Sequence, residues 1–120
     1  MTTNYRDITR SVSASLGQLR ADQPDLMKNF RALSDTALRE GVLDHKTKEL
    51  IALCLGVAGH CDACIGFHVK ALVKAGATRA EIEEALGVAV YMGGGPSLMY
   101  AADVLTAFEQ MSVPAASVAA

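Results

Sequence analysis

The chain has 120 residues and a net charge of −2, with 51% hydrophobic and 20% charged residues. This length suits one core, so we expect a single domain over residues 1–120, with its core at about 25–110. Because no run of Lys or Arg is present, we do not expect the protein to bind nucleic acid or anionic membranes. The polar amino terminus does not resemble a secretory signal, which indicates a cytoplasmic protein.

Hydrophobic residues recur every three or four positions along most of the chain, which predicts helices. The first is expected over about 5–20. The second begins at Pro24, a residue favoured in a first helical turn, and runs to a C-terminal cap at Gly41. Asp44 is the expected N-cap of a third helix, whose core stripe is Leu50, Leu53, Cys54 and Val57.

The third helix is expected to end where Ala58-Gly59-His60 interrupts the apolar pattern. A fourth helix then runs from about Cys61 to Ala75. The sequence Thr78-Arg79-Ala80-Glu81 matches a capping box, in which two side chains satisfy free backbone N–H groups at a helix start. It therefore predicts a fifth helix, which continues through Tyr91.

The glycine-rich segment Gly93-Gly94-Gly95 predicts a tight turn between two packed helices, although free amides there could also hold an anion. Pro96 begins a sixth helix that is expected to reach about Met111, and residues 112–120 are expected to form a frayed tail. No segment shows the sustained alternation of a strand. The sequence therefore predicts an all-α protein, a compact bundle of about six helices.

The candidate functional residues are two cysteines and a histidine. Cys61, Cys64 and His68 are spaced so that they fall on one face of a helix. A thiol at a helix start lies near unpaired amides, whose partial positive charge favours the thiolate. His68, one turn after Cys64, can exchange a proton with it. Three cysteines in a cytoplasmic protein indicate catalysis or metal binding more than a static disulfide.

A carboxylate on the preceding helix is the fourth candidate. Glu49 shares its helix face with small residues, which allow another helix to approach closely, and a partly buried carboxylate needs a partner. His68 or a thiol could be this partner, and so could Lys46 or a distant Arg. Of the other histidines, His60 is interpreted as a loop residue and His45 as a solvated residue of a first helical turn.

Two other interpretations of the cysteine pair stay open. A zinc-binding or redox-sensor module could use Cys61, Cys64 and His68 as three ligands, with Cys54 or Glu49 as the fourth. Structural zinc, however, usually joins two separate ligand pairs, and this sequence has no second pair. Cys54 lies on the core stripe, where a small hydrophobe is sufficient explanation. The other interpretation is a pair of inert core thiols, which fits poorly with a glycine-flanked helix start.

The spacing of Glu49, Cys61, Cys64 and His68, together with AGATRAEIEEAL and YMGGGPSLMYA, resembles the alkylhydroperoxidase D-like branch of the carboxymuconolactone decarboxylase superfamily. The resemblance implies an all-helical fold, a homotrimer or homohexamer, and antioxidant reduction of peroxides by a cysteine pair, with no cofactor or metal. In the well-studied branch a histidine precedes the second cysteine, where this chain has Ala63. The decarboxylase branch lacks the cysteine pair, so decarboxylation with Glu49 and His68 is the alternative.

These residues allow a peroxidase mechanism to be written. Cys64 loses its proton beside His68, while Glu49 holds the imidazole or a bridging water. The thiolate attacks the terminal oxygen of a hydroperoxide and becomes a sulfenic acid, with which Cys61 condenses to a disulfide. A thiol reductant then restores the dithiol. The reverse assignment stays open, because Cys61 is nearer the helix start.

Overall fold

The computed structural model describes residues 3–114, which form six α-helices. They are α1 (Tyr5–Asp22), α2 (Pro24–Leu38), α3 (His45–Ala58), α4 (Asp62–Lys74), α5 (Arg79–Gly93) and α6 (Gly95–Ser112). No strand occurs within residues 3–114, and the predicted all-α fold is confirmed. None of the helices in this part of the chain is long and apolar enough to cross a bilayer.

The helix ends differ from the predicted ones mainly at α2. It ends at Leu38, before the predicted cap at Gly41, because the backbone of Arg39 is extended. The last helix ends at Ser112. Most of the predicted frayed tail, residues 115–120, lies outside the described residues.

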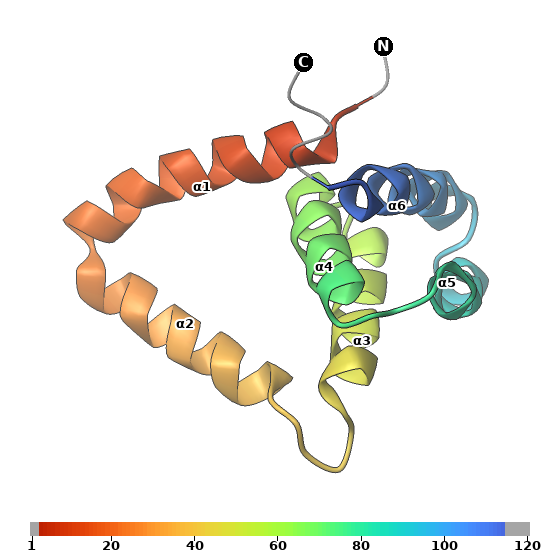
Figure 1. Cartoon of the computed structure of the whole chain (residues 1–120), viewed down its shortest axis with the longest axis horizontal. Coiled ribbons are helices and arrows are strands. Elements are labelled where there is room, and N and C mark those ends of the chain that lie inside the picture. Colours follow the sequence, from red (N-terminus) through yellow and green to blue (C-terminus); the bar gives the residue numbers. More distant parts are fainter. Residues whose placement is uncertain (1–2, 115–120) are drawn as a thin grey trace.

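The core lies where α3, α4, α5 and α6 meet, with α3 and α4 side by side in its centre (Figure 1). Each of these helices buries an apolar stripe. The largest fully buried aliphatic side chains are Leu53, Val57, Ile65, Val69, Leu72, Ile82 and Val104. Burial of one such side chain contributes about 1.5–3 kcal/mol, so these contacts fix how α3 lies against α4.

The first two helices form an arm that projects from this core (Figure 1). The arm is anchored at its two ends, by the buried Tyr5 and Thr9 at the beginning of α1 and by the contact of α2 with α3. No residue of α2 is buried, and its side chains Leu26, Phe30 and Leu33 are 56%, 65% and 63% exposed. The arm therefore leaves an apolar stripe of α2 uncovered in the single chain.

The predicted N-caps of two helices are confirmed. Asp44 accepts a hydrogen bond from the Thr47 backbone N–H at 2.7 Å at the start of α3. Thr78 and Glu81 form the capping box of α5. Lys46 pairs with Glu81 at 2.7 Å, which joins the start of α3 to α5.

A single residue, Gly94, separates α5 from α6. Its φ of +73° lies in a region that residues with a Cβ rarely adopt. A Cβ on Gly93 would lie 2.0 Å from the Ser97 hydroxyl oxygen, so this glycine allows the two helices to meet closely. The predicted tight turn at Gly93-Gly94-Gly95 is confirmed.

Candidate functional site

The cysteine pair lies at the start of α4. Cys61 is the N-cap of this helix, and the Cys64 backbone N–H donates to the Cys61 Sγ at 3.2 Å. A disulfide joins the two sulfurs. The helix start therefore brings an amide donor to the Cys61 sulfur, an arrangement that stabilises a thiolate once the disulfide is reduced.

A close approach of α3 and α4 positions Cys64. A Cβ on the buried Gly56 of α3 would lie 3.0 Å from the Cys64 Cβ. This spacing is tighter than ordinary van der Waals contact, so only a glycine fits without a shift of the neighbouring atoms. The small face of α3 therefore sets the position of the second cysteine.

The buried carboxylate of Glu49 has His68 as its partner. Glu49 is 3% exposed, and its Oε2 lies 2.7 Å from His68 Nδ1. An ionised carboxylate only accepts hydrogen bonds, so Nδ1 carries the hydrogen and Nε2 of the neutral ring is free to take a proton. Of the partners that the sequence left open, the structure selects His68, because Lys46 pairs with Glu81.

A second imidazole lies next to the same carboxylate. His45 Nε2 is 3.8 Å from Glu49 Oε1, and His45 Nδ1 is 2.7 Å from the Leu38 carbonyl oxygen. His45 lies in the first turn of α3, as predicted, with its side chain 41% exposed, and each of its ring nitrogens also faces a protein group. Its position four residues before Glu49 was the signal that could have revealed this contact.

The phenol of Tyr5 and the carboxyl groups of Asp62 and Asp103 lie near one another at the N-terminus of α4. The Tyr5 hydroxyl donates to Asp62 Oδ1 at 3.2 Å, which ties α1 to the start of α4. Burial, together with the negative charges of Asp103 and Asp62, raises the pKa of Tyr5. Burial also raises the pKa of Asp103, with a smaller contribution from Asp62. The phenol therefore stays protonated and continues to donate.

The loop residue His60, directly before Cys61, lies where the sequence predicts, between α3 and α4. Its φ is +53°, and its ring stacks on Tyr100 of α6 with centroids 4.7 Å apart and planes 2° apart. The stack holds the segment that leads into the N-cap against α6. Sequence spacing contained no signal for this long-range contact.

The third cysteine lies apart from the pair. Cys54 is a free thiol that packs against the core, and its Sγ lies 3.4 Å from the Ala85 carbonyl oxygen. Burial raises the pKa of this thiol. Among residues 3–114, no group of three or more His, Cys, Asp or Glu side chains is arranged to hold a metal ion.

Similar solved structures share this arrangement of helices. A carboxymuconolactone decarboxylase family protein of Legionella pneumophila is 53% identical, with a TM-score of 0.90 over 91% of this chain and 97% of its own. A family member from Thermotoga maritima, for which a role in the antioxidative response has been suggested, is 35% identical, with a TM-score of 0.66 over 71% of this chain and 88% of its own.

Sequence comparisons agree with the structural ones. An uncharacterised protein of Cupriavidus necator is 35% identical over 112 residues, which are 93% of this chain and 99% of that protein. The model of the carboxymuconolactone decarboxylase family matches residues 24–107, a range that includes Glu49, both paired cysteines and His68. This chain therefore belongs to the carboxymuconolactone decarboxylase family.

Proposed function

We propose that this protein is a thiol-dependent peroxidase, a dithiol–disulfide oxidoreductase that reduces hydroperoxides through Cys61 and Cys64. The observation that carries this proposal is the position of the bonded cysteine pair relative to His68. Cys64 lies one turn before His68 at the start of α4, and His68 is hydrogen-bonded to Glu49. A proton acceptor within a turn of a redox-active thiol is what peroxide chemistry requires. The antioxidative role suggested for the Thermotoga maritima relative supports the same class of function.

The oxidative half of the reaction begins at Cys64. His68 Nε2 takes the thiol proton, and the resulting imidazolium is stabilised by Glu49. The thiolate attacks the terminal oxygen of the hydroperoxide, the O–O bond breaks, and the departing alkoxide takes a proton to become an alcohol. Cys64 is left as a sulfenic acid. The Cys61 thiol then displaces water from that sulfur, and a disulfide forms.

The reductive half restores both thiols. A thiolate of the reductant attacks the Cys61 sulfur, and the electron pair of the S–S bond moves to Cys64, which takes a proton from His68. A second thiol of the reductant then displaces Cys61 and becomes oxidised to a disulfide. Cys61 leaves as a thiolate, the form that the Cys64 backbone N–H stabilises.

The test is oxidation of the reduced protein by hydrogen peroxide and by an organic hydroperoxide. We expect wild type and Cys54→Ser to lose two thiols per peroxide consumed, measured by thiol titration and intact mass. Cys61→Ser should stop at a sulfenic acid that dimedone traps, and Cys64→Ser should consume no peroxide. If reduced wild type reacts no faster than free cysteine with either oxidant, the proposal is wrong.

A further inference from the structure

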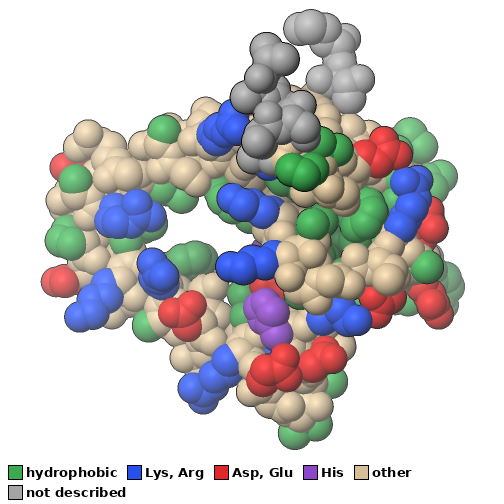
Figure 2. Space-filling model, in the orientation of Figure 1, with side chains coloured by type: hydrophobic (Ala, Val, Ile, Leu, Met, Phe, Trp, Pro, Cys, Tyr) green, Lys and Arg blue, Asp and Glu red, His purple; other side chains and the backbone are tan. Residues whose placement is uncertain are grey.

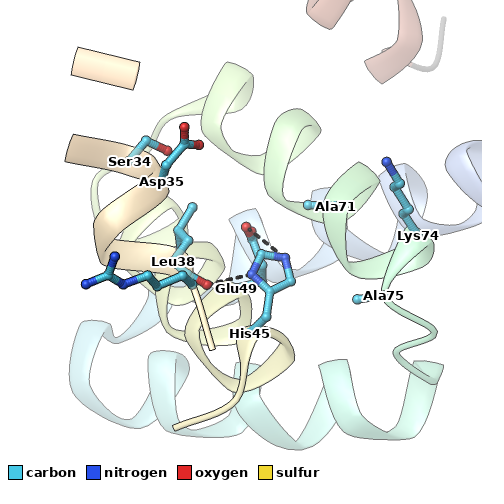
Figure 3. A pocket seen from close by; sticks show the side chains of 9 residues that line it. Ser34, Asp35, Leu38, His45, Glu49, Ala71, Lys74 and Ala75 are labelled. Carbon is cyan, nitrogen blue, oxygen red and sulfur yellow. Dashed lines mark hydrogen bonds and ion pairs between the residues drawn. The ribbon is translucent and has the colours of Figure 1, made fainter. Parts of the chain in front are cut away.

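A pocket beside Glu49 and His45 has no part in the mechanism above. It has a volume of about 640 Å³ and lies between α2, α3 and α4 (Figure 3). Lys and Arg side chains gather around the hollow between the α1–α2 arm and α4, with a histidine beside it (Figure 2). Glu49 is almost fully buried, yet it lines this pocket together with His45.

The position of His45 leaves one of its nitrogens free to gain or lose a proton. The Leu38 carbonyl can only accept, so His45 Nδ1 carries a hydrogen at 2.7 Å from it. The nitrogen that titrates is therefore Nε2, which faces Glu49 Oε1 (Figure 3). At 3.8 Å this contact is too long for a hydrogen bond and is an ion pair only when the ring is protonated, so Nε2 can exchange a proton with water in the pocket.

The carboxylate of Glu49 thus lies between two imidazoles, with Oε2 toward His68 and Oε1 toward His45. A buried carboxylate without a cation is costly. When both imidazoles are charged, however, they repel each other across one negative charge. The two rings therefore share one negative charge, so a proton on one of them makes a proton on the other less favourable.

We propose that His45 is a positioning residue of the dithiol site, which replaces the positive charge next to Glu49 whenever His68 gives its proton to Cys64. In reduction, His68 protonates the departing Cys64 thiolate, and His45 Nε2 takes up a proton from pocket water. In formation of the thiolate, His68 takes the proton of Cys64 and His45 releases one to the pocket. The inference rests on the proposed dithiol chemistry, although not on the identity of the oxidant.

Other charges near His45 act on its protonation as well. Its backbone N–H donates to Glu40 Oε1 at 3.0 Å, and charged groups from three elements line the same pocket. These groups are Asp35 on α2, Arg39 after α2, Glu49 on α3 and Lys74 on α4. Among them Glu49 has the ion-pair contact to the ring, which makes it the group that we expect to couple to His45.

The test uses His45→Gln, which keeps a side-chain donor for the Leu38 carbonyl but cannot carry a charge. Two rates are measured from pH 5.5 to 8.5: reduction of the Cys61–Cys64 disulfide by dithiothreitol, and alkylation of Cys64 by iodoacetamide, read by peptide mass spectrometry. At pH 6 we expect reduction to be slower and alkylation faster, each roughly five-fold. Both differences should shrink as the pH rises.

Two further variants make the outcome decisive. His45→Lys keeps a charge that is not released, so its alkylation should be no faster than that of wild type at pH 6 and slower at pH 8. Lys74→Gln removes a charge of the same pocket that makes no ion pair with Glu49, and both rates should be unchanged. Opposite changes in the two rates are not expected from a structural defect, and thermal melts confirm that the variants fold.

Equal rates for His45→Gln and wild type at pH 6, or both rates changed in the same direction, would overturn the inference. Neither assay contains a hydroperoxide. A wild-type protein that fails to react with peroxides would therefore disprove the proposed peroxidase, while the two rates would still decide the role of His45.

Discussion

Glu49 of α3 and His68 of α4 are joined by a hydrogen bond of 2.7 Å between Oε2 and Nδ1, and the carboxylate is almost completely shielded from water. The bond fixes the hydrogen of the neutral ring on Nδ1. It also directs the influence of the carboxylate through the imidazole. A negative charge that faced a thiolate directly would instead hinder its formation.

Removal of either partner should therefore slow the first chemical step. We expect His68→Ala and Glu49→Gln each to lower the second-order rate of sulfenic acid formation by roughly ten- to thousand-fold, as for a lost acid–base partner. The double variant should be little slower than His68→Ala alone, because residues that act as one unit are not additive. Dimedone trapping in a Cys61→Ser background measures this rate. Faster oxidation in Glu49→Gln would mean that the carboxylate faces the sulfur.

The contact between Gly56 and Cys64 makes a prediction about packing. In Gly56→Ala the new Cβ would meet the Cys64 Cβ at 3.0 Å, which should cost about 1–3 kcal/mol of stability as an overpacked site. The matched control is Gly87→Ala on α5, where no atom lies within 4 Å of the added Cβ. This control should gain up to about 1 kcal/mol from helix propensity. Urea unfolding of both variants measures the difference, and equal stabilities would contradict the close approach.

The raised pKa of Cys54 predicts a slow thiol. Because burial disfavours the thiolate, a smaller fraction of Cys54 is ionised at a given pH than of an exposed cysteine. In the reduced native protein, iodoacetamide should label Cys61 and Cys64 before Cys54. The rate for Cys54 should be about ten times lower in the native protein than in protein unfolded by guanidinium. Peptide mass spectrometry over a time course gives the three rates. Disulfide mapping that found Cys54 bridged to either paired cysteine would contradict its separate place in the core.

Asp103 provides a pH-dependent test of the cluster around Tyr5. Its raised pKa means that the folded chain binds this proton more tightly than the unfolded chain, so its ionisation weakens the fold as pH rises. Asp103→Asn should stabilise the protein at pH 7 by about 0.5 kcal/mol, or about 2–4 °C. The gain should vanish near pH 3, where the wild-type carboxyl is protonated. Glu84→Gln, an exposed change on α5, should show no such dependence.

The local features of this fold were predictable from the sequence because their causes are local. Periodic apolar residues, the cap at Asp44 and the capping box at Thr78 determine where helices begin, and the structure confirms them. The small residues on the helix face of Glu49 indicated that another helix packs closely there, which limited the partner of Glu49 to a few candidates, His68 among them. Only the packing of α3 against α4 decided among those partners.

Contacts between distant segments were not predictable in this way. The hydrogen bond of Tyr5 to Asp62 and the stack of His60 on Tyr100 join residues whose spacing has no period in common. The contact of His45 with Glu49 was missed for a different reason. Its helical spacing from Glu49 was visible, but the carbonyl of Leu38 that fixes its ring comes from a loop whose path depends on tertiary structure.

The uncovered stripe of α2 leads to the last prediction. Leu26, Phe30 and Leu33 are each more than half exposed along one helix, and we expect other copies of the chain to cover them in a homotrimer or homohexamer. Phe30→Glu should then lower the mass measured by light scattering at micromolar concentration. Val42→Glu is the control, because Val42 is a fully exposed apolar residue in the loop after α2. The same introduced charge there should leave the assembly intact, and a wild-type protein that is already monomeric would refute the expectation.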